Sequence, residues 1–178
     1  MEKVIVTLRN SSADDAWVDT LCGPVAGELL GLGLPGVTVN VRDAPVRASL
    51  MTLTTLDPPV QAVVSLWTDQ HYGPQVRTAL EVLRRHADMV AAYLVTESVP
   101  MRPPAVAPGQ RAPGLANIAL LRRPAEMDET TWFQRWLGEH TAVAIATQST
   151  FGYVQNCVVR ALTPDAPAVS AIVEELFP

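Results

Sequence analysis

Basic side chains are scarce in this chain and they are not clustered. Among 178 residues there are 13 Lys and Arg against 18 Asp and Glu, which gives a formal net charge of −5. A nucleic-acid-binding surface needs Lys and Arg gathered on one face of a basic domain. The composition therefore disfavours a nucleic-acid partner. Uninterrupted apolar runs of transmembrane length are also lacking, so we expect no membrane partner. The first residues resemble a strand rather than a signal peptide, which favours a cytoplasmic protein.

Cysteine and histidine are rare as well. Cys22 and Cys157 are the two cysteines, too few and too far apart for a metal cluster or a disulfide framework. We interpret both as small core side chains. Three scattered histidines do not make a metal site, and the chain has no Gly-rich phosphate loop or nucleophile-elbow motif. We therefore expect neither a metal nor a cofactor.

What the chain does contain is a weak internal repeat, and a repeat determines the fold that a sequence can adopt. Each copy has a β-rich segment, a helical stretch with one matched tryptophan and two further β-rich segments. The first copy comprises 4–9, Trp17, 36–40 and 60–64, and the second comprises 117–122, Trp132, 152–156 and 169–173. The repeat predicts two copies of one α+β module. Residues 70–98 of the first copy have no counterpart before residue 178.

The first module, residues 1–98, has the pattern of a βαββαβ unit. Alternating and helical spacings of apolar residues predict strands at 3–9, 37–41, 60–67 and 93–99, and helices at 16–30 and 75–93. Gly23-Pro24 should kink or split the first helix, because proline removes a backbone hydrogen bond. This order is the split βαβ arrangement of ferredoxin-like folds.

A proline-rich linker, residues 99–114, precedes the second module, residues 115–178. The second module should have a strand at 117–122, a helix opened by Asp128 and running to about Thr147, and a strand at 152–160. The segment 168–177 fits either a helical face or a strand. Its place in the repeat favours a strand, because tertiary context overrides weak periodicity.

His140 is the best candidate for a catalytic residue. Phe133, Trp136, His140 and Val143 recur at spacings of three and four, so a regular helix would place them on one face, packed against the sheet. Burial there would lower the pKa of the imidazole and keep it neutral. The aligned position in the first copy holds Val25, so packing alone does not require histidine. The alternative is a structural histidine bonded to the backbone.

Four other residues are candidates for a binding pocket. Tyr153 and Asn156 lie on opposite faces of one strand and could line a polar cavity or bond across the sheet. Trp67 begins a segment just beyond a strand end, where binding groups often gather. Arg122, which matches Arg9 in the first copy, is either an anchor for an anionic ligand or part of a structural ion pair.

Residues 117–178 resemble the EthD family. The resemblance rests on Ala119-Leu-Leu-Arg-Arg123, on the Phe133-x-x-Trp136-x-x-x-His140 helix, on Gly152-Tyr-Val-Gln-Asn156 and on Val173-Glu-Glu-Leu-Phe-Pro178. It implies tandem ferredoxin-like modules that form a pseudo-dimer of the dimeric α/β-barrel type. Family members usually continue with a further helix and strand, so the second module is expected to be C-terminally incomplete. An uncovered strand edge favours aggregation, so we expect a homodimer.

The resemblance implies a poorly defined function and leaves alternatives open. One is a cofactor-independent enzyme of the monooxygenase, cyclase/dehydratase or isomerase type, which leaves both oxidoreductase and lyase as reaction classes. It would act on a small apolar or aromatic molecule, with His140 as its proton-transfer group. Trp136, Phe133 and Trp67 would shape the pocket. The second alternative is a non-catalytic ligand-binding or accessory protein with the same pocket, and the third is a haem-binding relative with His140 as the axial ligand.

Overall fold

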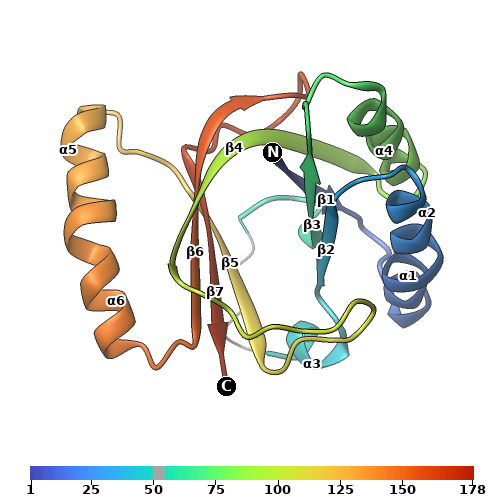
Figure 1. Ribbon diagram of the computed structural model, residues 1–178, viewed down its shortest axis with the longest axis horizontal. Helices are drawn as coiled ribbons and strands as arrows, with labels where there is room; N and C mark the ends of the chain where they lie inside the picture. The colour runs from blue at the N-terminus through green and yellow to red at the C-terminus, as the bar shows by residue number, and fades with distance from the viewer. Residues whose placement is uncertain (50–54) are drawn as a thin grey trace. The chain divides into compact units, whose positions relative to one another are not determined.

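Figure 1 shows the computed structural model, which describes residues 1–49 and 55–178. The described residues form an α+β fold, as the sequence predicts. The pairings β1–β3, β1–β4, β2–β3, β5–β7 and β6–β7 are antiparallel. The strands are β1 (Glu2–Arg9), β2 (Gly36–Val41), β3 (Val60–Thr68), β4 (Met89–Met101), β5 (Leu115–Leu121), β6 (Gly152–Ala161) and β7 (Ala171–Phe177). The helices are α1 (Asp15–Thr20), the π-helix η1 (Leu21–Val25), α2 (Ala26–Gly31), α3 (Ala44–Arg47), α4 (Pro74–Arg84), α5 (Glu129–Phe133), the π-helix η2 (Gln134–His140) and α6 (Thr141–Thr147).

The chain divides into two compact units. The first comprises Met1–Val95 with Val159–Pro167, and the second comprises Thr96–Val158 with Ala168–Pro178. Both β4 and β6 therefore continue from one unit into the other along the chain.

The first unit has the strand order β2-β3-β1-β4. The helices α1, η1, α2 and α4 supply the core that packs against alternate residues of the strands (Figure 1). The fully buried members of this core include Val4, Val6, Leu8, Leu29, Val64, Leu66, Ala79 and Leu83. The element order matches the expected βαββαβ unit, with the short helix α3 added between β2 and β3. The hairpin arm or loop expected at 43–59 lies partly outside the described residues.

One helix boundary in this unit was predicted wrongly. The helix expected at 75–93 ends at Arg84, and the next strand begins at Met89 rather than near Tyr93. Residues 91–95 form a continuous buried run, which is typical of a strand buried on both faces. Apolar residues in such a run also satisfy helical spacing, so periodicity alone extends the helix too far.

The second unit repeats part of this topology. Its strand order is β4-β6-β7-β5, so β6-β7-β5 has the same order as β2-β3-β1 in the first unit. The strand prediction for 168–177 is confirmed by β7. Strand β5 lies at the end of this order and, among the described residues, pairs with β7 alone. The core between the strands and the α5–η2–α6 helix includes Trp132, Trp136, Ala144, Tyr153, Ala171 and Val173.

Both long helices contain a π turn at corresponding places. Leu21–Val25 interrupts the first helix around Gly23-Pro24, where the sequence predicts a kink, and Gln134–His140 interrupts the second. A π turn holds one more residue than an α turn, and such turns are often found at functional sites. The shared interruption supports the internal repeat.

The cysteines are not both core residues. Cys22 is exposed, which contradicts the expectation for it, and Cys157 is half-buried. Desolvation raises the pKa of the Cys157 thiol, although a hydrogen bond with Thr96 partly offsets this. Among residues 1–49 and 55–178, no group of three side chains could hold a metal ion, and no helix has the length and hydrophobicity needed to cross a bilayer.

Candidate functional site

The second unit contains a cleft of about 410 Å³ beside the edge strand β5 and the helix α5–η2. Its floor is apolar and aromatic, and the side chains of two arginines and one histidine lie around it. The lining residues are Leu120, Leu121, Arg122, Pro124, Met127, Trp132, Arg135, Trp136 and His140. The cleft therefore brings together His140, Trp136 and Arg122 from the residues that the sequence singles out.

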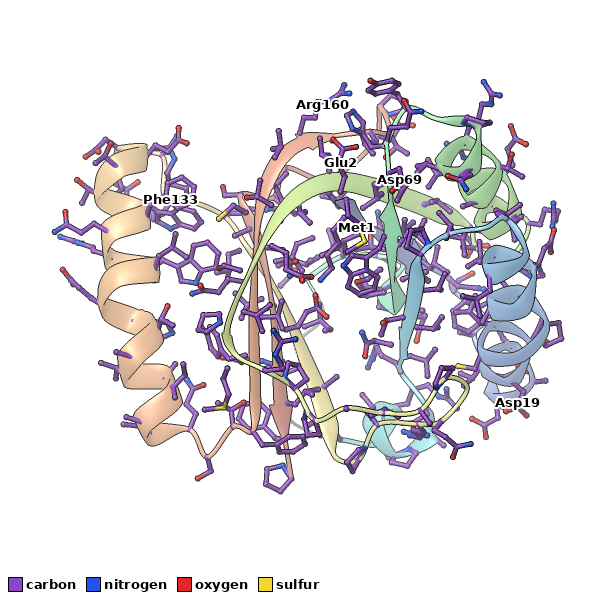
Figure 2. The ribbon with its side chains drawn as sticks, viewed as in Figure 1. Met1, Glu2, Asp19, Asp69, Phe133 and Arg160 are labelled. Atoms are coloured by element: carbon purple, nitrogen blue, oxygen red, sulfur yellow. The ribbon has the colours of Figure 1, made fainter. Side chains whose placement is uncertain are left out.

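The aromatic floor is a stacked cluster on one helix. The ring centroids of Trp132 and Trp136 lie 5.1 Å apart, and the Phe133 ring lies 5.1 Å from Trp132 and 6.4 Å from Trp136. Phe133, labelled in Figure 2, packs against both indoles and is not among the residues that line the cleft. Such contacts between tilted rings stabilise a cluster beyond the area that they bury. The cleft therefore has a closely packed aromatic floor.

A cap fixes the start of this helix. The Asp128 carboxylate accepts hydrogen bonds from the Thr131 backbone N–H at 2.9 Å and from its hydroxyl at 2.6 Å. These bonds, the hydroxyl bond first, lower the pKa of Asp128. The Arg123 guanidinium donates to the Met127 carbonyl. The segment between β5 and α5, which forms one wall of the cleft, is therefore tied at both ends.

A chain of hydrogen bonds anchors the π turn of η2. The Trp136 carbonyl accepts from the Thr141 N–H and, at 2.9 Å, from the Thr141 hydroxyl. The Gln155 amide donates to the same hydroxyl at 2.6 Å, and its carbonyl accepts from the Ser98 hydroxyl at 3.1 Å. Buried polar groups of this kind are costly unless all of them are paired. The network therefore holds the turn that carries Arg135, Trp136 and His140.

Tyr153 lies behind the floor rather than in the cleft. It is fully buried on the helix-facing side of β6, beside Trp136. Desolvation, followed by the nearby Glu175 charge, raises the pKa of its phenol, and the neighbouring Trp136 and Gln155 side chains partly offset this rise. The phenol is therefore neutral at physiological pH, and it serves to support the indole of Trp136.

The predicted burial of His140 is wrong. Trp132, Trp136, Thr141 and Ala144 are the buried positions of this helix, whereas His140 and Val143 are exposed. Because the π turn adds one residue between Trp136 and the next inward position, Thr141 takes the place that a regular helix would give to His140. The imidazole therefore stands at the rim of the cleft. Within the described residues it has no hydrogen-bond partner.

Two predicted pocket residues lie away from the cleft. Asn156 is fully buried on the opposite face of β6, where its amide donates to the Ile172 carbonyl and to the Glu174 carboxylate, each at 3.0 Å. Trp67 belongs to the first unit, where the Lys3 ammonium lies 4.8 Å from its ring centroid. The opposite orientations of Tyr153 and Asn156 are as the sequence predicts.

Sequence reasoning missed six of the nine lining residues, among them Trp132, Arg135 and Met127. Trp132 was used only to align the repeat, although its spacing of four from Trp136 places both rings on one helix face. Arg135 and Met127 carry no pattern of their own. Arg122 lines the cleft, whereas its counterpart Arg9 donates to the backbone carbonyls of Asp57 and Pro58. The matched arginines therefore have different surroundings.

Comparisons with known proteins do not identify a family for this chain. No family model matches the chain, and no curated protein matches it. Among solved structures, 98% of this chain aligns with 76% of a chain from Lactobacillus acidophilus NCFM described as a "putative monooxygenase". The alignment has 9% identity and a TM-score of 0.47. Both values are too low to support an inference about this chain.

Proposed function

We propose that the cleft of the second unit binds a small apolar or aromatic molecule that carries a negative charge. The observation that carries this proposal is the combination of a stacked indole floor with the side chains of Arg122, Arg135 and His140 in one cleft. Its volume of about 410 Å³ lies in the range of small-molecule sites. Aromatic faces bind flat apolar groups, and guanidinium groups bind carboxylates.

We further propose that the protein is an EthD-like, cofactor-independent enzyme of the monooxygenase, cyclase/dehydratase or isomerase type. His140 would then transfer a proton to or from the bound molecule. An imidazole can accept or donate a proton when it lies within hydrogen-bond reach of its substrate. One observation favours the alternative, a non-catalytic binding protein: His140 is exposed and no described residue orients it. The open cleft would also leave most of a haem uncovered, so we do not propose haem binding.

Binding is tested by NMR titration with naphthoate, an aromatic carboxylate. We expect saturable shifts in the indole N–H signals of Trp132 and Trp136, while those of Trp17 and Trp67 stay in place. Arg122→Gln combined with Arg135→Gln should weaken the affinity at least about tenfold, equivalent to about 1.4 kcal/mol. Uniform small shifts in all four indoles would refute a site at this cleft.

Catalysis is tested on those compounds that bind. His140→Ala should lower turnover by about 100-fold, the low end of the range for a proton-transfer group, because no described residue orients the imidazole. Glu139→Ala, a change at the neighbouring exposed position, should leave turnover unchanged. Product would be followed by mass spectrometry. Binding without turnover of any bound compound would favour the non-catalytic alternative.

We also propose that the protein is a cytoplasmic homodimer and that its units are tandem ferredoxin-like modules of the dimeric α/β-barrel superfamily. The repeated strand order supports the modules, and the edge position of β5 supports the dimer. Multi-angle light scattering should give twice the mass of 19.2 kDa. A monodisperse monomer at micromolar concentration would contradict the dimer.

A further inference from the structure

A second pocket, of about 380 Å³, lies in the first unit, and three arginine side chains line it. It runs along α4 and the segment 160–162, both of which belong to the first unit. The side chains of Arg77, Arg84 and Arg160 line it, together with His71. Three guanidinium groups on one small pocket are unusual for a chain whose formal net charge is −5.

One of these arginines is held in place by a half-buried histidine. The Glu2 carboxylate accepts from the His71 backbone N–H at 2.6 Å and pairs with His71 Nδ1 at 2.9 Å. Since Nδ1–H donates to Glu2, the His71 Nε2 lone pair is free to accept from the Arg160 guanidinium, 2.7 Å away. Figure 2 labels Glu2 and Arg160, the first and last residues of this series of hydrogen bonds. The side chain of His71 is only 10% exposed, so the Glu2–His71–Arg160 hydrogen bonds form part of the pocket wall.

The other two arginines have no acidic partner. Within the described residues, neither Arg77 nor Arg84 forms an ion pair, whereas the adjacent Arg85 donates to Glu28 at 2.6 Å. Among the described residues, no carboxylate lines the pocket, and Glu2 contacts the His71 nitrogen opposite the one that faces Arg160. Two of the three guanidinium groups therefore have no ion-pair partner among the described residues, and an oxyanion would be their complement.

The remaining lining residues favour an organic ligand. Val76, Leu80 and Leu162 provide an apolar floor between the guanidinium groups. Tyr72, which is 76% exposed, stands edge-on to the His71 ring with the centroids 5.0 Å apart. An exposed aromatic side chain at the mouth of a pocket can cover a flat group of the ligand.

We propose that this pocket binds a small organic oxyanion, a phosphate monoester or a carboxylate, with Arg77, Arg84 and Arg160 on the anionic group and the apolar floor under the rest. Guanidinium groups bind the oxygens of both anions in pairs, which gives direction as well as affinity. The site is separate from the cleft of the second unit and does not depend on the function proposed there.

The experiment is a titration of the full chain with phenyl phosphate, benzoate and inorganic phosphate, followed by amide NMR signals. Saturable shifts should be confined to residues that line the pocket, and either phenyl phosphate or benzoate should bind more tightly than inorganic phosphate. The tighter of the two organic probes identifies the anionic group. Equal affinity for phenyl phosphate and inorganic phosphate, with no benzoate binding, would overturn the assignment to an organic ligand.

Substitutions on α4 provide the matched control. Arg77→Gln combined with Arg84→Gln should weaken the better probe at least about tenfold, because two of the three guanidinium groups are lost. Arg85→Gln removes one positive charge at the C-cap of α4, outside the pocket, and should change affinity less than about twofold. All three positions are exposed, so the fold should persist, and thermal unfolding would verify it. Equal weakening by the single control and the pair would show that net charge alone binds the anion.

Discussion

Replacing Trp136 with Ala should lower the free energy of unfolding by about 3–5 kcal/mol, which is the usual cost of truncating a buried tryptophan. Trp136 is 6% exposed and packs against Trp132, Phe133 and Tyr153. Its loss would leave a cavity beneath the helix and remove half of the stacked floor of the cleft. Urea denaturation followed by far-UV circular dichroism would measure the change.

Two variants on the same helix act as controls for Trp136→Ala. Val143→Ala shortens a side chain that is 58% exposed, and it should change stability by less than about 0.5 kcal/mol. Trp136→Phe keeps a ring in place and should cost less than the alanine variant. If Trp136→Ala and Val143→Ala cost the same, the side-chain register that the π turn sets for this helix would be wrong.

Naphthoate binding gives a second readout of the same substitution. Because Trp136 is part of the cleft floor, Trp136→Ala should also abolish the shift of the Trp132 indole signal on titration. Val143→Ala should keep it. A stable Trp136→Ala protein that still binds naphthoate would place the ligand elsewhere and contradict the proposed function.

The strands could be predicted well because their patterns are short and repeated. Alternation in 37–41 and the correspondence between the two copies predict β2, β6 and β7, and β7 in particular follows from the repeat where its own periodicity favours a helix. The end of α4 could not be predicted. Val90 belongs to the strand but continues the helical spacing of Val76, Leu80 and Leu83, so only the tertiary structure distinguishes the two.

The side-chain positions on the α5–η2–α6 helix show a different limit. A helical wheel assumes 3.6 residues per turn, and the π turn between Gln134 and His140 breaks that assumption. Every inward position after Trp136 therefore moves by one residue, from His140 to Thr141 and from Val143 to Ala144. His140 still reaches the cleft, but from its rim. The spacing of apolar residues does not reveal such a turn. Both π turns nevertheless contain a glycine at matched positions of the two copies, Gly23 and Gly138.

The candidate sites differ in how far the sequence could indicate them. The sequence predicted Trp136 and His140 together on one helix face and Arg122 as a possible anion anchor, and the structure places all three in one cleft. The second pocket had no sequence signal as a unit, because His71, Arg84 and Arg160 come from distant segments. Their juxtaposition depends on the pairing of a residue near the start of β1 with the loop after β3, and on the position of the segment after β6.

Gly114→Ala should destabilise the protein by about 3 kcal/mol, whereas Gly109→Ala should cost about 1 kcal/mol. Both glycines lie in the proline-rich segment before β5 with positive φ, +82° and +77°. A Cβ atom would meet nothing within 4 Å at Gly109, but at Gly114 it would lie 2.0 Å from the Phe177 carbonyl oxygen. Both variants therefore incur the cost of a left-handed backbone, and only Gly114→Ala also incurs a clash with a backbone atom that cannot rotate away.

That clash falls where β5 begins to pair with β7, next to the Leu115–Phe177 pair. Relief requires the two strands to separate at this end, so Gly114→Ala should speed amide exchange along β5 and the end of β7, and Gly109→Ala should not. Urea denaturation of both variants, with hydrogen exchange resolved by residue, tests this. Equal stability and equal exchange in the two variants would mean that β5 does not lie against the end of β7. The proposed dimer would then lose its support, because it depends on β5 being an edge strand that pairs with β7 alone.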